Sequence, residues 1–278
     1  MKIKRVYLEI TNACNLDCPF CTNIKGQSFM SLDTIKEYLK QIKQVSDYVY
    51  LHVLGEPLLH KDLSKILEYT DELNLNVQLV TNGTLLANNL NIFNHKSLRK
   101  LSISLHSISD SNINNSYFEN IKNIININTS TYIELRFYDL NNLSSDLKDF
   151  KEYLYTQYKV IDTPKKNSFK IKDNVYIYYA DLFDWPSINN DFISNNGNCH
   201  GGIDQIAILN NGKVTICCLD PNGYNEIGDL KKNSLIEILS SNIYQTVINN
   251  FRNRKLTFEL CKRCSYRLRF DDKHNLKQ

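Results

Sequence analysis

The sequence lacks any apolar run long enough to cross a membrane. A transmembrane helix needs about 18 or more consecutive apolar residues, and no such run occurs in the 278 residues. Residues 1–5 lead directly into an alternating segment, without the long apolar stretch of a signal peptide. These absences exclude a membrane-spanning helix, make secretion unexpected, and predict a cytoplasmic protein.

An excess of charge of one sign is also absent. The 33 Lys and Arg residues nearly balance the 30 Asp and Glu residues, which leaves a formal net charge of +3. A balance so close to neutral gives no electrostatic reason to expect avid binding to nucleic acid. Apolar residues make up 42 % and charged residues 23 %, which is typical of a folded soluble protein. A protein of this length can form about one or two domains without disulfides.

Cysteine is missing from the middle of the sequence. None lies between Cys21 and Cys199, and the eight cysteines stand in two groups, one on each side of this interval. Where no secretion is expected, such clusters are more typical of metal ligands than of disulfides. The two groups therefore predict two separate metal sites.

The first group, Cys14, Cys18 and Cys21, has the spacing C-x3-C-x2-C. Structural zinc takes four protein ligands, and no fourth Cys or His lies close by in the sequence. Three thiolates can instead hold a four-iron four-sulfur (4Fe-4S) cluster with one iron open to a small molecule. We therefore expect a site-open 4Fe-4S cluster here, with a partial zinc knuckle as the alternative.

Strand and helix patterns alternate through the first half of the sequence. The predicted strands cover residues 5–11, 48–54, 76–81, 98–106 and 132–138. The predicted helices cover residues 31–45, 62–73, 84–93, 113–127 and 144–158, the first with Ser31 as its N-cap. This alternation predicts an α/β fold with a parallel sheet and right-handed crossovers.

One face of the predicted strands carries polar side chains. Side chains alternate between the two faces of a strand, and parallel strands are normally apolar on both. One parity here holds Glu9, Thr11, His52, Gln78, Asn82, Ser102, Ser104, His106, Glu134 and Arg136. We expect this set to face a polar lumen and the opposite, apolar parity to face the helices. Buried polar groups that pair with one another are the alternative.

Two later motifs, with the cysteine motif, resemble the radical S-adenosylmethionine (SAM) superfamily. Gly55-Glu56-Pro57 resembles its Gly-Gly-Glu-Pro motif, with Leu54 in place of the first Gly, and residues 81–83 resemble the Thr-Asn-Gly of many relatives. The resemblance implies that S-adenosylmethionine chelates the open iron and is cleaved to a 5′-deoxyadenosyl radical, which abstracts a substrate hydrogen. It also implies a partial (β/α)6 TIM-like barrel, made of five strand–helix units and a sixth strand.

The resemblance also assigns cofactor contacts. The Gly-Glu-Pro turn holds the methionyl ammonium, and Glu56 could bond it directly. Arg136 could pair with the methionyl carboxylate or, alternatively, with Glu134 or Glu9. The expected cofactor-binding residues, which include a ribose contact at Ser104 and an adenine neighbour at Phe20, are Phe20, Gly55, Glu56, Pro57, Asn82, Ser104 and Arg136.

The second cysteine group resembles Twitch, a short form of the SPASM auxiliary-cluster domain. Residues 206–217 predict a β-hairpin with an Asn211-Gly212 turn, and residues 235–249 predict a helix. The resemblance implies one auxiliary 4Fe-4S cluster on Cys199, Cys217, Cys261 and Cys264. Cys218 is the alternative to Cys217, and a zinc site on the same thiolates is the alternative to the cluster.

The resulting domain prediction is a partial barrel over residues 1–185 and a small α+β iron–sulfur domain over residues 186–278. The basic residues near the end of the sequence are expected on a solvated face, with contact to a phosphate as the alternative; they are Lys262, Arg263, Arg267 and Arg269.

The segment from Leu51 to His60, the total length and the Asn content resemble the bacterial queuine lyases. That resemblance implies cleavage of the C–N bond in the side chain of queuine, releasing 7-aminomethyl-7-deazaguanine for tRNA-modification salvage. Glu9, His52, Gln78, His106 and Glu134 are expected to bind the substrate. Of these, Glu9, His52 and His106 are expected to be catalytic, with Glu9 or His106 handling the proton of the amine.

Three other functions stay open. A radical SAM dehydrogenase of a small polyol or aminocyclitol, or a peptide-modifying radical SAM enzyme, would use the same motifs. A zinc- or iron-binding regulatory module would use the cysteines without catalysis. The enzymatic interpretations imply a small-molecule or peptide substrate and a reductant of the flavodoxin or ferredoxin type.

Overall fold

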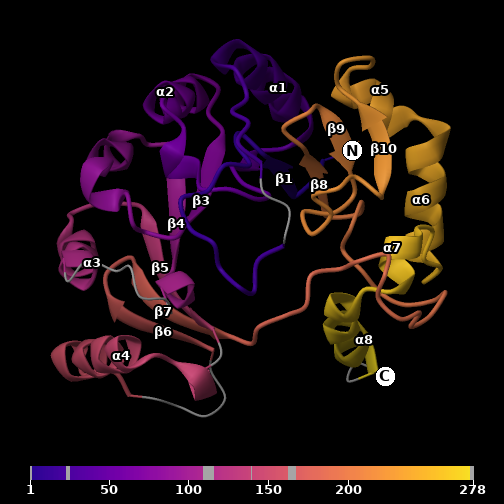
Figure 1. Ribbon diagram of the computed structural model, residues 1–278. Coiled ribbons are helices and arrows are strands. Elements are labelled where there is room, and N and C mark those ends of the chain that lie inside the picture. Colours follow the sequence, from indigo (N-terminus) through magenta and orange to yellow (C-terminus); the bar gives the residue numbers. More distant parts are fainter. Residues whose placement is uncertain (1, 23–25, 109–115, 139, 162–166, 276–278) are drawn as a thin grey trace. The chain divides into compact units, whose positions relative to one another are not determined.

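The computed structural model describes residues 2–22, 26–108, 116–138, 140–161 and 167–275 (Figure 1). Contacts divide the protein into two compact units. Unit A comprises residues 1–14, 19–55 and 183–278, and unit B comprises residues 15–18 and 56–182. The predicted functional boundary after residue 185 stays a prediction.

Unit A holds five strands in the order β10-β9-β8-β1-β2. They are β1 (Arg5–Leu8), β2 (Tyr48–Tyr50), β8 (Gln205–Ile208), β9 (Lys213–Thr215) and β10 (Glu226–Asp229). Strand β1 is parallel to both β2 and β8, whereas β9 is antiparallel to β8 and β10. The hairpin predicted over residues 206–217 is confirmed as β8 and β9, with Gly212 at φ +92° in the turn.

The helices of unit A are α1 (Leu32–Val45), α5 (Leu235–Ser240), α6 (Asn242–Arg252), α7 (Glu259–Lys262) and α8 (Leu268–Asn275). The N-cap of α1 is confirmed, because the Ser31 hydroxyl accepts the backbone N–H of Thr34 at 3.2 Å. The single helix predicted over residues 235–249 is wrong. Ser241 is extended, ends α5 and caps α6 by accepting the Tyr244 N–H, so two helices form.

Unit B holds five strands in the order β3-β4-β5-β7-β6. They are β3 (Asn76–Thr81), β4 (Leu98–Ser104), β5 (Tyr132–Tyr138), β6 (Ser168–Lys172) and β7 (Val175–Ala180). Strands β3, β4, β5 and β7 are parallel, and β6 pairs antiparallel with β7. Strand β7 is therefore the expected sixth parallel strand, preceded by an edge strand that was not predicted.

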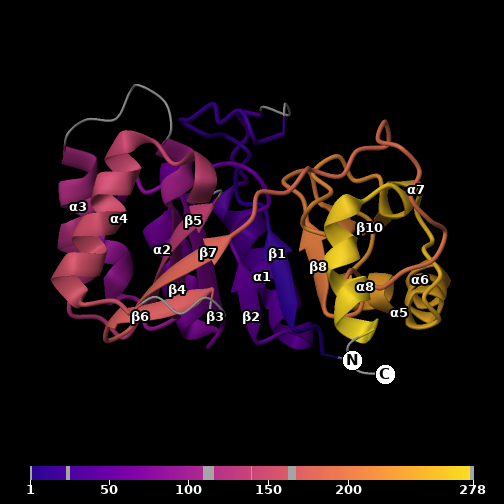
Figure 2. The ribbon, with the colours of Figure 1, turned by 90° about the horizontal axis from the view of Figure 1, so that it is seen from below.

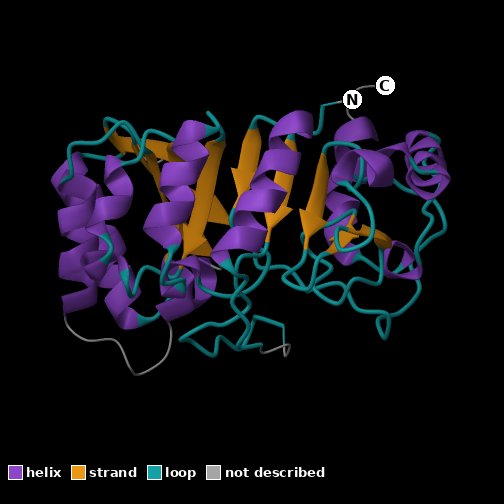
Figure 3. Ribbon diagram, turned by 90° about the horizontal axis from the view of Figure 1, so that it is seen from above, coloured by secondary structure: helices purple, strands orange, loops and turns teal. Residues whose placement is uncertain are grey.

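The helices of unit B are α2 (Leu63–Glu72), α3 (Ser116–Asn126) and α4 (Ser145–Tyr158). Figures 1 and 2 show them along one face of the unit's strands, and Figure 3 gives the same elements by type. Strands that alternate with helices and pair in parallel confirm the α/β class. In the described part of the protein, no helix is long and apolar enough to cross a membrane.

Several predicted boundaries are wrong. Strand β2 ends at Tyr50 and β4 at Ser104, where a 3₁₀ turn (Leu105–Ile108) follows, so His52 and His106 lie beyond the strand ends. The helix predicted over residues 84–93 is two 3₁₀ turns, Leu86–Asn88 and Leu90–Asn94. Asparagine, frequent in this segment, competes with the helical backbone for hydrogen bonds. Residues 113–115 of another predicted helix lie outside the described residues.

The apolar parity of the predicted strands is confirmed as core. All its members are at most 8 % exposed, and they are Leu8, Ile10, Leu51, Val53, Val77, Leu79, Ile103, Leu105, Ile133, Leu135 and Phe137. Removing such side chains from water is the largest favourable contribution to folding. The polar side chains on the opposite face of the strands are therefore the candidates for the functional site.

Candidate active site and cysteine centre

The first cysteine loop leaves β1 and returns beside it. Thr11 pairs with Phe29 in an isolated antiparallel bridge, and the Thr11 hydroxyl donates to the Ser28 carbonyl at 2.9 Å. These bonds pin the base of the loop. The thiols of Cys14 and Cys21 are exposed and that of Cys18 is half-buried. The fold thus presents three thiols on one anchored, solvent-reaching loop, which suits a cluster that must meet a cofactor.

The Gly-Glu-Pro turn packs on the backbone that leads into this loop. Gly55 has φ +77°, and a Cβ at this position would lie 2.5 Å from the Thr11 carbonyl oxygen and 2.8 Å from that of Ala13. Both the left-handed backbone and the close approach therefore require glycine. The first glycine of the family motif is Leu54 here, and its side chain is buried.

Glu56 joins two of the sequence motifs. Its carboxylate is 1 % exposed and accepts the Leu58 N–H at 3.0 Å, the Thr81 hydroxyl at 2.8 Å and the Asn82 N–H at 2.8 Å. Burial raises the pKa of Glu56, and the three hydrogen bonds oppose that rise. These contacts show Glu56 holding the motif backbone. Its direct bond to the methionyl ammonium stays a prediction.

Asn82 is tied to the cysteine loop through a residue that the sequence reasoning missed. Its Nδ2 donates to Asn15 Oδ1 at 3.0 Å, and Asn15 Nδ2 donates to the Thr84 hydroxyl at 2.8 Å. The buried Tyr117 hydroxyl donates to the Asn82 carbonyl at 3.0 Å. Asn15 follows Cys14 directly and could have been found by that position. No pattern in the sequence pointed to Tyr117.

Glu9 connects two segments of unit A. Its carboxylate is 4 % exposed and accepts the backbone N–H of Leu54 at 3.1 Å and that of Asn210 at 3.0 Å. Burial raises the pKa of Glu9, and the two hydrogen bonds oppose that rise. Asn210 lies in the β8–β9 turn, so Glu9 fixes this turn to the residue before Gly55. Its catalytic and substrate-binding roles stay predictions.

Three further expected site residues are His52, Gln78 and Phe20. The ring of His52 meets the rings of Tyr7 and Tyr50 edge-on, with centroids 5.5 Å and 6.1 Å away. Gln78 is half-buried on β3, and Phe20 is half-buried beside Cys21. Their roles toward substrate and cofactor stay predictions.

A charged network occupies the polar parity of unit B. Glu134 on β5 accepts Arg136 Nε at 2.6 Å, Lys100 Nζ at 2.7 Å and the Ser102 hydroxyl at 3.0 Å. Burial raises the pKa of Glu134, but the charges of Arg136 and Lys100 outweigh it and hold the pKa below its usual range. Ser104 lies opposite Arg136 in the β4–β5 register.

This network bears on the expected role of Arg136. Of the predicted partners of Arg136, the structure shows the ion pair with Glu134. The pairing of Arg136 with the methionyl carboxylate stays a prediction. The sequence reasoning missed Lys100. It lies two residues before Ser102, so its side chain is on the same face of the strand, and this spacing could have identified it. The network leaves two cations beside one carboxylate on the polar face.

His106 lies at the end of the same face. Burial, followed by the nearby charge of Arg136, lowers the pKa of His106 to about 4. Its ring centroid is 4.1 Å from that of Tyr138. The imidazole is therefore neutral at pH 7 and only weakly basic there. Its catalytic and substrate-binding roles stay predictions.

The second cysteine group surrounds one cavity in unit A. Cys199, Cys217, Cys261 and Cys264 all line it, together with Asn225 and Arg267. The Gly201 N–H donates to Cys199 at 3.3 Å, the Leu219 N–H to Cys217 at 3.3 Å, and Asn225 Nδ2 to Cys261 at 3.6 Å. Backbone N–H groups of residues 266 and 267 donate to Cys264. Each sulfur thus has a donor suited to a thiolate.

The arrangement of these thiols bears on the metal centre that they could hold. Four thiols around one cavity can ligate the four irons of a 4Fe-4S cluster, and the same thiols could bind zinc. Which of the two they bind stays a prediction. Burial raises the pKa of Cys199 to about 11, so binding must displace its proton.

Cys218 has a different environment from Cys217. It packs with Tyr7 against a small apolar cluster of Val53, Ala207 and Leu209. Cys217 lines the cavity with the other three thiols, so the structure favours the ligand set that includes Cys217.

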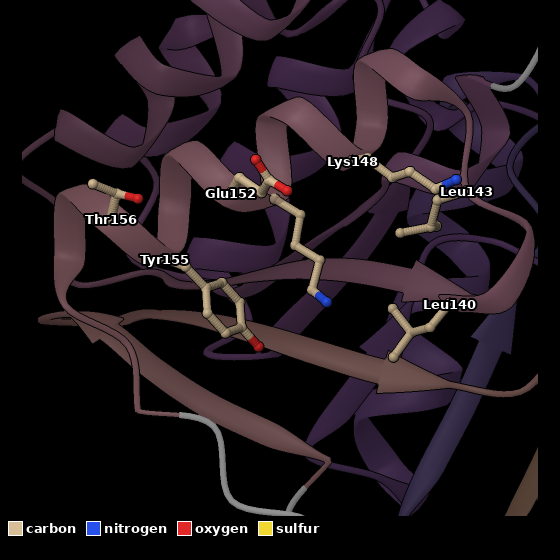
Figure 4. A pocket seen from close by; sticks show the side chains of 7 residues that line it. Leu140, Leu143, Lys148, Glu152, Tyr155 and Thr156 are labelled. Atoms are coloured by element: carbon tan, nitrogen blue, oxygen red, sulfur yellow. The ribbon is translucent and has the colours of Figure 1, made fainter.

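A separate hollow lies on unit B, beside α4 (Figure 4). It is lined by Leu140, Leu143, Lys148, Lys151, Glu152, Tyr155 and Thr156. None of the predicted site residues lines this hollow.

Family comparisons match both parts of the protein. Residues 8–135 match the family model of the radical SAM superfamily, and residues 199–265 match that of the SPASM iron–sulfur cluster-binding domain. The first match contains the Cys14–Cys21 and Gly-Glu-Pro motifs, and the second contains all four cavity cysteines.

Among curated proteins, GTP 3′,8-cyclase of Aquifex aeolicus is 26 % identical over 116 residues, 38 % of this chain and 36 % of that protein. PqqA peptide cyclase of Rhodopseudomonas palustris is 31 % identical over 86 residues, 30 % of this chain and 23 % of that protein. GTP 3′,8-cyclase of Staphylococcus saprophyticus is 30 % identical over 144 residues, 48 % of this chain and 41 % of that protein. Each match spans less than half of the relative.

Solved structures share the fold over nearly the whole chain. BtrN in complex with AdoMet and 2-DOIA is 16 % identical, with a TM-score of 0.56 over 95 % of this chain and 94 % of that one. Streptococcus suis SuiB bound to precursor peptide SuiA is 14 % identical, with a TM-score of 0.62 over 95 % of this chain and 71 % of that one.

Proposed function

We propose that the protein is a radical SAM enzyme with a C-terminal SPASM iron–sulfur domain and that its substrate is a small polar molecule. S-adenosylmethionine on the open cluster supplies the 5′-deoxyadenosyl radical of this superfamily. The protein's own residues supply binding, orientation and exclusion of water. The alternative of a zinc- or iron-binding regulatory module without catalysis is less well supported, because the match is to an enzyme superfamily.

The observation that carries the substrate class is the charged network of unit B. Lys100, Glu134 and Arg136 place two cations and one carboxylate on the polar parity of neighbouring strands. Glu134 compensates part of this charge, which leaves one excess positive charge on the polar face. A substrate with hydroxyl or acidic groups can share that charge, whereas an apolar substrate would offer it no partner.

Relative size supports a small molecule over a long peptide. The likeness to BtrN covers 94 % of that chain, whose structure holds the small ligand 2-DOIA, whereas the likeness to peptide-bound SuiB covers 71 %. This favours the predicted dehydrogenase or lyase of a small molecule, with peptide modification as the second candidate. The findings support this class but not queuine itself, whose cleavage stays a prediction. The flavodoxin or ferredoxin-type reductant and the cytoplasmic location also stay predictions.

The test is an anaerobic assay of the full-length protein. After cluster reconstitution, S-adenosylmethionine and dithionite are added with queuine, an aminocyclitol, a small polyol or a peptide, and 5′-deoxyadenosine and substrate products are followed by mass spectrometry. We expect 5′-deoxyadenosine to rise severalfold with one small polar compound. Release of 7-aminomethyl-7-deazaguanine would identify queuine, and a two-electron oxidised polyol or aminocyclitol would identify a dehydrogenase.

Two variants control this assay. The triple substitution Cys14→Ala, Cys18→Ala and Cys21→Ala should abolish 5′-deoxyadenosine, and Cys218→Ser should retain it. Stimulation by the peptide alone would replace the proposed substrate class. No 5′-deoxyadenosine from an iron-loaded parent would contradict the radical chemistry itself.

A further inference from the structure

Arg267 is buried, and the expectation of a solvated face is wrong for this residue. It is 2 % exposed and lines the cavity of the four cysteines. Its Nε donates to the Cys261 carbonyl at 3.2 Å and its Nη1 to Asp271 Oδ2 at 2.8 Å. A Cβ on Gly197 would lie 2.1 Å from Nη1, so the guanidinium is also held by close packing. The side chain therefore has a fixed position.

The third nitrogen of this guanidinium has no partner. Nη2 of Arg267 is buried and makes no hydrogen bond within the described part of the protein. A buried donor without an acceptor is destabilising, and more so when it is charged. The cavity that Arg267 lines is bordered by four sulfur atoms, which become anionic acceptors when they bind iron.

We propose that Arg267 is a positioning residue for the auxiliary cluster, with Nη2 donating a hydrogen bond to one of its sulfur atoms. The positive charge offsets the negative charge that the cluster gains on reduction, so Arg267 raises its reduction potential. Asp271 and the Cys261 carbonyl orient the guanidinium for this purpose. The inference rests on the auxiliary cluster of the proposed enzyme but not on the identity of the substrate.

Arg263 provides a matched control. It lies between Cys261 and Cys264 on the same loop, but its Nη1 donates to the Asn190 carbonyl at 2.8 Å, and it does not line the cavity. A charge lost at Arg263 changes the net charge of the loop by the same amount. A larger effect of substitution at Arg267 than at Arg263 therefore indicates direct contact of Arg267 with the cluster.

The first experiment needs no substitution at Arg267. The full-length protein with Cys14→Ala, Cys18→Ala and Cys21→Ala carries only the auxiliary cluster, and its arginines are labelled with ¹⁵N in the guanidinium. Pulsed electron paramagnetic resonance of the reduced cluster should show a weak ¹⁵N coupling, which Arg263→Lys retains. A reduced cluster without ¹⁵N coupling overturns the proposal, and so does a site that binds zinc in place of iron.

The second experiment is a redox titration of the same background with Arg267→Gln, Arg267→Lys or Arg263→Gln. Iron content and circular dichroism confirm that each protein is folded and loaded. Arg267→Gln should shift the auxiliary potential to more negative values, and Arg267→Lys should shift it less because the charge remains. An unchanged potential in Arg267→Gln, or an equal shift in Arg263→Gln, contradicts the proposal. Neither readout depends on cleavage of S-adenosylmethionine. A failed activity assay would therefore not contradict the proposed role of Arg267.

Discussion

At the scale of single residues, three buried carboxylates have different partners, and they are Glu9 and Glu134 of the polar set and Glu56 of the Gly-Glu-Pro turn. Glu9 and Glu56 accept hydrogen bonds from neutral groups, mostly backbone N–H, and burial raises the pKa of each. Glu134 faces two cations, which hold its pKa low. The first two carboxylates hold the backbone of the motifs in place, and the third completes a buried charged network. Residue type alone did not distinguish these tasks, but the hydrogen-bond and charge partners do.

Glu9→Gln tests the burial of one of these carboxylates through the pH dependence of stability. Because the folded-state pKa of Glu9 is raised above its ordinary value of about 4.5, its contribution is fully present below that value and is lost as pH rises through the folded pKa. The parent should therefore lose stability relative to Glu9→Gln as pH increases. Urea titrations of both proteins from pH 4 to pH 8 measure the difference.

Glu9→Gln also has an effect that does not vary with pH. The amide of Gln places a donor where Leu54 or Asn210 needs an acceptor, and we expect a loss of about 1–3 kcal/mol at low pH. Stability curves of the two proteins that stay parallel across the pH range would show that Glu9 is not a buried titrating group.

At the scale of elements, short turns decide where the motif residues lie. The Gly55 turn ends the segment after β2, and the extended Ser241 splits one expected helix into α5 and α6. The capping box of Ser234 and Glu237 begins α5. These turns depend on one or two residues each, so single substitutions can test them.

Gly55→Ala tests the turn that carries the Gly-Glu-Pro motif. The left-handed backbone costs about 1–2 kcal/mol for alanine, and collision with the Thr11 and Ala13 carbonyls adds about 1–3 kcal/mol. We expect lower stability in urea and weaker binding of S-adenosylmethionine, measured by calorimetry on the reconstituted enzyme.

Gly223→Ala is the matched control for this turn. Gly223 has φ +73°, but a Cβ there would meet its nearest neighbours at 3.5 Å, which is ordinary contact. It should show only the backbone cost and bind the cofactor normally. Equal losses in the two variants would mean that the close approach at Gly55 is unimportant.

At the scale of the whole molecule, the protein must hold two clusters. Cys14 and Cys21 lie on one loop of unit A, and the four cavity cysteines come from three separate segments of the same unit. Those segments are far apart in the sequence, and only folding brings them together. Metal binding at the auxiliary site therefore requires that these three segments are correctly folded.

Iron content tests the ligand set of the auxiliary site. The loaded parent should hold about eight irons per molecule, four for each cluster. Cys217→Ser leaves three thiolates at the auxiliary site, so it should hold fewer irons than the parent and still cleave S-adenosylmethionine slowly, whereas Cys218→Ser should retain about eight. Iron and sulfide analysis of the purified proteins measures this. Loss of iron in Cys218→Ser with full retention in Cys217→Ser would reverse the assignment.

The sequence by itself determined the family, the α/β class, the apolar core and the two cysteine groups. These features depend on local spacing and periodicity. Examples are the three cysteines within eight residues and the alternation of apolar and polar residues over β3 and β5. The N-cap at Ser31 and the hairpin at Asn211-Gly212 could also be predicted, because short-range chemistry fixes them. The substrate was not determined in this way, since many substrates share these motifs.

Only the tertiary structure decided which polar residues meet. Glu9 bonds a turn about 200 residues away in the sequence, Asn15 reaches Asn82, and Arg267 is buried among the cysteines instead of facing solvent. Such contacts arise from packing between distant segments, and no local pattern encodes them. The different surroundings of Cys217 and Cys218 have the same origin, because the fold places Cys217 on the cavity and Cys218 against the apolar cluster.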